Sequence, residues 1–157
     1  MQYKKFMLIF QKEFDKYVEL KNVIEEKRNF LIDNDLKSLA YILESENQLI
    51  KEIENLENKR NEFLRENNSQ EVLSFQDVLS YASEIEKNNM RQLRKNFLEI
   101  LKEITNLNKS NKQIIEQALQ VNKISLQALH STLEQSGVYN KPGNKKKNSQ
   151  HIIDRKV

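Results

Sequence analysis

The chain has 157 residues, of which 38% are hydrophobic and 31% charged, a composition that supports one domain with a thin core rather than a thick globule. The absence of Cys excludes disulfides and thiolate zinc sites. With only two Gly and one Pro, strands joined by tight turns are disfavoured. The formal net charge is +3, but six Lys and Arg side chains lie after residue 135 against one Asp, so the rest of the chain is nearly balanced.

The first predicted element is a helix over about residues 3–32. Apolar residues recur there at helical spacing with charged residues between them, namely Tyr3, Phe6, Met7, Phe10, Phe14, Tyr17, Val18, Ile24 and Leu31. The apolar run FMLIF near its start is too short for the core of a signal peptide and is followed by charges. No segment approaches the roughly 18 apolar residues that span a bilayer. We therefore expect a cytoplasmic protein without a membrane span.

A second helix is predicted from about Asp35 to residue 67. The preceding DND stretch favours helix ends, because its side chains can accept hydrogen bonds from free backbone N–H groups. The expected apolar face of this helix comprises Leu36, Leu39, Leu43, Leu49, Ile50, Ile53, Leu56, Phe63 and Leu64. Both helices have about 30 residues, and matched lengths with a short connection predict an antiparallel hairpin.

Two pairs with the spacing of an N-terminal capping box follow the hairpin, Ser74 with Asp77 and Ser83 with Glu86. A short helix is expected near the first pair, and either pair could open a third long helix. Residues 84–135 contain no Gly or Pro, which predicts a helix of roughly 78 Å. Since this is longer than the hairpin, we expect about 30 of its residues to pack on the hairpin and those after about residue 113 to extend beyond it.

The resulting fold class is all-α, an elongated antiparallel helical hairpin plus a long third helix, with a helical domain over 1–135 and a basic flexible tail over 136–157. The tail combines Gly137, Pro142 and Gly143 with few apolar residues, so burial cannot offset its ordering entropy. Its lysines have no aromatic residues between them, and the body of the chain is not basic. We therefore expect no nucleic-acid partner.

The stretch NLNKSNKQIIEQALQVN, residues 106–122, places asparagines within an apolar helical pattern. At 100° per residue, the apolar positions of residues 114–133 cover roughly 220° of the helix, whereas one partner helix needs about 100°. This surplus predicts a second partner, which could be another segment, another copy or a different protein. Asn108, Asn111 and Asn122 fall within about 60° inside this sector. Either the amides set the register of a bundle, or they bind an incoming helix.

Catalytic and metal-binding patterns are absent from the sequence. It has no Gly-rich phosphate loop and no Cys nucleophile, and His130 and His151 are too few and too far apart for a metal cluster. We therefore expect no enzymatic activity, no cofactor and no metal.

NLNKSNKQIIEQALQVNKISLQAL, with GVYNKPG downstream, resembles the C-terminal half of the FlgN family of flagellar export chaperones. LKSLAYILESENQLIKEIENLENKRNEFL is similar to that family's second helix, whereas Asn140 follows Tyr139 where the family more usually has a Tyr-Gly pair. The resemblance implies a cytoplasmic chaperone of flagellar type III secretion. Such a protein binds the C-terminal helical regions of hook-filament junction proteins, keeps them unassembled and delivers them to the flagellar export gate.

Carried over to this sequence, the resemblance implies cargo-binding roles for Asn108, Asn111, Ile115, Leu119, Asn122, Leu126 and Leu129, with Tyr139 as a clamp. Laying a partner's amphipathic helix along an apolar face is also a common recognition mode on physical grounds. The alternative is a self-associating structural coiled-coil protein, a homodimer through the apolar face of the third helix. A scaffold should keep that dimer contact, whereas a chaperone should exchange it for cargo.

Overall fold

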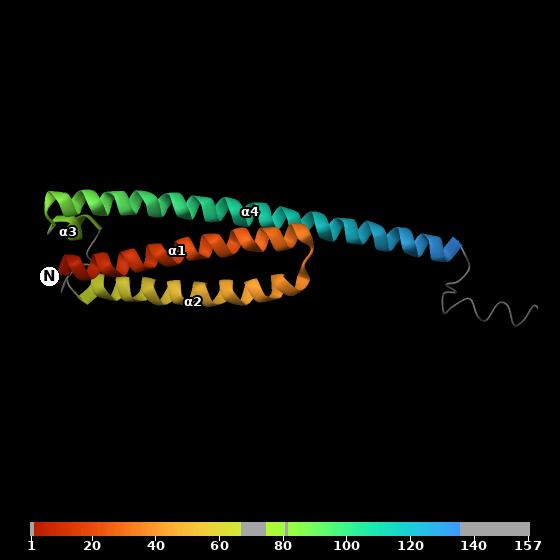
Figure 1. Cartoon of the computed structure of the whole chain (residues 1–157), viewed down its shortest axis with the longest axis horizontal. Coiled ribbons are helices and arrows are strands. Elements are labelled where there is room, and N and C mark those ends of the chain that lie inside the picture. Colours follow the sequence, from red (N-terminus) through yellow and green to blue (C-terminus); the bar gives the residue numbers. More distant parts are fainter. Residues whose placement is uncertain (1, 67–74, 81, 136–157) are drawn as a thin grey trace, which may run out of the picture. The chain divides into compact units, whose positions relative to one another are not determined.

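The structure, a computed structural model, describes residues 2–66, 75–80 and 82–135. Its elements are α1 (Gln2–Asp33), α2 (Leu36–Glu66), α3 (Phe75–Ser80) and α4 (Glu84–Gln135), as Figure 1 shows. These residues contain no strand, and the all-α prediction is confirmed. The chain divides into two compact units, residues 1–114 and 115–157, and α4 contributes residues to both.

The turn between α1 and α2 is built by local hydrogen bonds. Asn34 has a φ of 55°, the left-handed conformation that ends many helices, and the Asp35 N–H donates to the Phe30 carbonyl at 3.0 Å. The Asp35 carboxylate then accepts the Ser38 N–H at 3.1 Å and so caps α2, as its residue type predicts. One residue therefore ends α1 and the next begins α2.

The interface of the hairpin follows a seven-residue repeat. The α1 positions of this repeat, spaced alternately four and three apart, are Phe6, Phe10, Glu13, Tyr17, Leu20, Ile24 and Lys27, and the α2 positions are Ile42, Glu46, Leu49, Ile53, Leu56, Arg60 and Phe63. Lys27 pairs with Glu46 and Glu13 pairs with Arg60, so residue numbers fall along α2 as they rise along α1. The hairpin is antiparallel, as predicted, and Figure 1 shows the two helices side by side.

Two ion pairs are enclosed in this interface. Arg60 Nη1 donates to both carboxylate oxygens of Glu13, at 2.6 and 2.8 Å, and the Glu13 side chain is only 1% exposed. Lys27 Nζ donates to both oxygens of Glu46 at 2.7 Å. Shifting one helix by a heptad would separate these partners and leave buried charges uncompensated, which is costly. The ion pairs therefore favour this register of α1 against α2.

The part of α4 within the first unit packs on the hairpin through its own heptad row: Met90, Leu93, Phe97, Ile100, Ile104, Leu107 and Asn111. The Tyr3 hydroxyl donates to the Glu86 carbonyl at 2.8 Å, the Phe10 and Phe97 rings stack at 5.2 Å, and Lys21 pairs with Glu103 at 2.7 Å. Because residue numbers rise together along both helices, this part of α4 runs parallel to α1.

The predicted capping box at the start of α4 is confirmed. The Ser83 N–H donates to the Glu86 carboxylate at 2.9 Å, and the Glu86 N–H donates to the Ser83 hydroxyl at 3.4 Å. The short helix expected before it is α3. Ser74 of the other predicted capping box lies outside the described residues, as does the tail over 136–157.

The predicted apolar face of α2 was wrong at three positions. Leu36, Leu43 and Ile50 are exposed, by 69%, 42% and 39% respectively, whereas Ile42 is buried. Leu43 and Ile50 each lie one position after a residue of the heptad interface, which rotates them by about 100° away from α1. Leu36 is the first residue of α2 and precedes the first interface position, Ile42. A helical period of about 3.6 residues places an interface position and the position after it in one broad apolar stripe. The contact with a single helix is narrower and buries only the first of the two.

Candidate helical binding surface

The second unit contains the largest set of exposed apolar side chains on α4. None of its described residues, 115–135, is buried, although seven of them are Ile, Leu or Val. Ile115 is 43% exposed and Leu119 63%, and the exposed apolar set continues through Val121, Ile124, Leu126 and Leu129. A surface of this kind on a long helix is typical of a site that another helix covers.

These side chains form two rows, each with heptad spacing. The leucine row comprises Ile115, Leu119, Asn122, Leu126, Leu129 and Leu133, and the second row comprises Gln117, Val121, Ile124, Ala128 and Ser131. At 100° per residue the centres of the two rows lie about 160° apart around the helix. Each row has the spacing needed to contact one partner helix, so the second unit offers contacts on nearly opposite sides.

Charged residues are scarce in this segment. Residues 115–135 contain only Glu116, Lys123 and Glu134 as permanently charged side chains, whereas charged residues make up 31% of the whole chain. His130 Nδ1 lies 3.7 Å from a Glu134 carboxylate oxygen. Burying most of this helix under partner helices would therefore require little desolvation of charge.

A shallow, mostly apolar hollow interrupts the leucine row. It is lined by Leu119, Asn122, Lys123, Leu126, Gln127 and His130. The Asn122 amide offers two donors and an acceptor within this apolar surface, and Lys123 adds a positive charge at the edge. The hollow can accept an apolar side chain from a partner helix while the amide bonds to a polar group beside it.

The three predicted asparagines do not share one environment. Asn111 is only 3% exposed and its Nδ2 donates to the Ile24 carbonyl at 3.2 Å, within the first unit, while its Oδ1 has no hydrogen-bond partner among the described residues. Asn108 and Asn122 are exposed. At about 100° per residue, all three asparagines were placed on one side of the helix. Burial also depends on which part of α4 packs on the hairpin, and that part includes Asn111.

Of the predicted cargo residues, Leu119, Asn122 and Leu126 line one hollow, and Ile115 and Leu129 belong to the same row. Tyr139 lies outside the described residues. The predicted site omitted Val121 and Ile124, which are 61% and 57% exposed. Their signal in the sequence was the second heptad row, which could have been recognised from the spacing of Val121, Ile124 and Ala128.

The described residues hold no group of three or more His, Cys, Asp or Glu side chains placed to bind a metal. Among the helices described, none has a stretch long and apolar enough to cross a membrane.

Comparison with known proteins identifies one family. Residues 1–147 match the family described as FlgN protein. No curated protein and no solved structure matches the chain.

Proposed function

Because the chain belongs to the FlgN family of flagellar export chaperones, we propose that it binds the C-terminal helical regions of hook-filament junction proteins in the cytoplasm, keeps them unassembled and delivers them to the flagellar export gate. The role is one of binding, without catalysis. The observation that carries this proposal is the exposed leucine row of α4, an uncovered heptad surface in a member of a chaperone family.

The cargo surface that we propose comprises Ile115, Leu119, Asn122, Leu126 and Leu129. A partner helix laid along this row would bury leucines that are 56% to 67% exposed. Full burial of one exposed Leu contributes about 1.5–3 kcal/mol, so the leucine row contributes several kcal/mol. Micromolar binding needs about 8 kcal/mol after the losses of association, so contacts outside this row have to supply the remainder. The second row can take another helix of the same cargo, which supports a wrapped arrangement around α4.

Asn111 is not included in this surface, because its amide would have to leave the Ile24 carbonyl to reach cargo. Contacts of Asn108 and Tyr139 with cargo stay predictions. Asn122 keeps the role of an amide within an apolar row, where it selects partners that supply a matching polar group.

The test is a calorimetric titration of the full chain with a C-terminal fragment of a hook-filament junction protein. The double variant Leu119→Ser, Leu126→Ser should bind at least about tenfold more weakly, since each replacement removes an apolar contact. Leu8→Ser is the matched control, because Leu8 is 57% exposed but lies on α1. Its affinity should equal that of the wild type.

The same experiment separates the chaperone from a structural coiled coil. If the double variant binds the fragment with unchanged affinity while its oligomeric state changes, the leucine row joins copies of this chain and the cargo proposal fails. Delivery has its own measurement: the chaperone with bound fragment should co-purify with the cytoplasmic part of the export gate, and failure to do so would remove the delivery step.

A further inference from the structure

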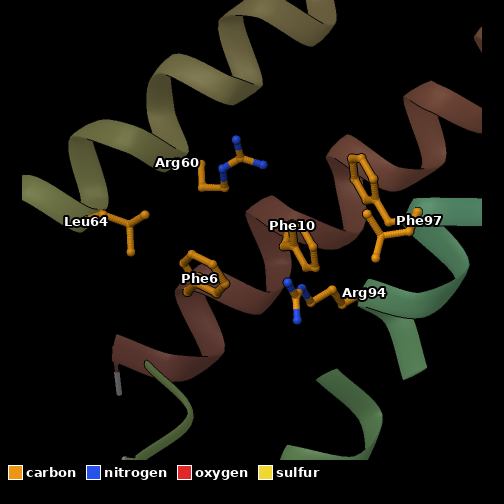
Figure 2. A pocket seen from close by; sticks show the side chains of 7 residues that line it. Phe6, Phe10, Arg60, Leu64, Arg94 and Phe97 are labelled. Carbon is orange, nitrogen blue, oxygen red and sulfur yellow. The ribbon is translucent and has the colours of Figure 1, made fainter. Parts of the chain in front are cut away.

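A pocket in the first unit lies between α1, α2 and α4, on residues that the proposed cargo surface does not use. It is lined by Phe6, Phe10, Arg60, Leu64, Arg94, Phe97 and Leu98 and has a volume of about 250 Å³. Figure 2 shows Arg60 and Leu64 on α2, Phe6 and Phe10 on α1, and Arg94 and Phe97 on α4 around this space. Three helices thus contribute to one pocket.

The wall of the pocket is aromatic and mostly buried. Phe6, Phe10 and Phe97 are 2%, 7% and 6% exposed, and their rings are held by stacking, at 5.9 Å between Phe6 and Phe10 and 5.2 Å between Phe10 and Phe97. Leu98 at the rim is 56% exposed. An apolar group placed in the pocket would meet preformed aromatic surface and would cover part of this leucine, so both changes favour binding.

Among the described residues that line the pocket, the charged side chains are both arginines and none is a carboxylate. Arg60 binds the buried Glu13 through Nη1, and a guanidinium carries five N–H donors, so this bond leaves Arg60 with further donors. Arg94 comes from the opposite helix, α4. Planar guanidinium groups match carboxylates with two parallel hydrogen bonds and also stack on aromatic faces.

We propose that this pocket binds an acidic peptide segment of a partner protein, which inserts one large apolar side chain between the phenylalanines and places flanking carboxylates against Arg60 and Arg94. The volume supports a side chain rather than a whole metabolite, because pockets for small molecules usually measure about 300–1,000 Å³. The two arginines set the sign of the flanking charge. This site is separate from the leucine row, which is nearly free of charge.

The probe is a fluorescently labelled peptide with one leucine between two pairs of glutamates, titrated with the full chain and followed by fluorescence anisotropy. Two matched peptides replace the glutamates by lysines or the leucine by alanine. The acidic leucine peptide should bind at least about tenfold more tightly than either. Its binding should weaken as salt is added, because the charged contacts are partly exposed.

Two variants at the rim test the site with little risk to folding. Arg94→Glu and Leu98→Ser, both at exposed positions, should each weaken binding of the acidic leucine peptide by about tenfold or more. Arg91→Glu is the control, because it makes the same charge change on α4 at a residue that does not line the pocket. Its effect should stay below about threefold, the size expected for long-range charge alone. Unchanged circular dichroism and thermal unfolding establish that each variant is folded.

Equal binding of the three peptides, or an Arg91→Glu loss as large as that of Arg94→Glu, would overturn the proposal. So would dodecanoate displacing the peptide at equal concentration, since the occupant would then be a small anionic amphiphile. The variant Leu119→Ser, Leu126→Ser should bind the peptide as the wild type does; if it does not, the peptide is bound by the leucine row instead. Failure of the cargo titration leaves these results unaffected.

Discussion

The same substitution at two asparagines of α4 should have opposite consequences. Asn111→Leu acts inside the first unit, where the side chain is 3% exposed and no other described residue bonds its Oδ1. Asn122→Leu acts on the exposed leucine row. Leucine is the better helix former at both positions, so helical content should be unchanged. We expect Asn111→Leu to change stability and Asn122→Leu to change association.

The magnitude at Asn111 follows from four effects. Losing the hydrogen bond to the Ile24 carbonyl costs about 1 kcal/mol, while removing a buried acceptor without a partner returns about 1–3 kcal/mol. Burying the leucine side chain contributes about 1.5–3 kcal/mol, and fitting it into the space of an amide costs about 1–3 kcal/mol. The net expectation is a gain of roughly 1 kcal/mol in the free energy of unfolding.

Urea unfolding followed by circular dichroism measures this change, and sedimentation velocity measures association. Asn111→Leu should raise the unfolding midpoint and leave the monomer–oligomer balance as in the wild type. Asn122→Leu should leave the free energy of unfolding within about 0.5 kcal/mol of the wild-type value and increase self-association, because it makes the leucine row continuous. A destabilisation of more than about 2 kcal/mol by Asn111→Leu would refute the reasoning, since it would mean that both ends of the amide are bonded.

Three further predictions concern the first unit. Burial raises the pKa of Glu13 to about 6 from 4.5, although Arg60 opposes the shift. The contribution of this pKa shift to the free energy of unfolding is therefore complete below pH 4.5 and is lost as the pH rises through 6. Relative to Glu13→Gln, the wild type should lose about 1–2 kcal/mol of unfolding free energy between pH 4.5 and 7; urea titrations showing a gain instead would mean that Arg60 outweighs burial. Met90→Ala should cost about 2–5 kcal/mol, because Met90 is 0% exposed, whereas Ile85→Ala, at a residue 75% exposed, should stay within about 0.5 kcal/mol. Asn34→Ala should lower stability by about 1 kcal/mol because of the φ of 55°, and Asn34→Gly should not; thermal unfolding of the pair checks this, and equal melting temperatures would contradict it.

Helix ends could be predicted from the sequence because their causes are local. Asp35 and Ser83 act on backbone groups within three or four residues, so residue type and spacing were sufficient. The length of α4 was equally accessible, since Gly and Pro are absent from it. These features do not depend on where the other helices lie.

The details of packing were less accessible. Charged residues at interface positions, such as Glu13 and Arg60, look like a solvated face until the partner helix is known, and only the strict seven-residue spacing of the interface includes them. The exposure of Leu43 was missed for the same reason. For Asn111 the angular position was right, but burial also depends on the axial extent of the hairpin, which a helical projection does not contain.

The order of contacts along the chain has a consequence for how the protein folds. The hairpin partners Lys27 and Glu46 are 19 residues apart, and Glu13 and Arg60 are 47 apart, whereas Tyr3 reaches Glu86 across 83 residues and Asn111 reaches Ile24 across 87. Because loop closure costs more entropy over longer separations, α1 and α2 should pair first, beginning at the turn between them, and α4 should pack on the hairpin afterwards. During synthesis, which proceeds from the N-terminus, α1 and α2 can thus pair on the ribosome, and the nascent helix carrying the leucine row is added to an already formed template.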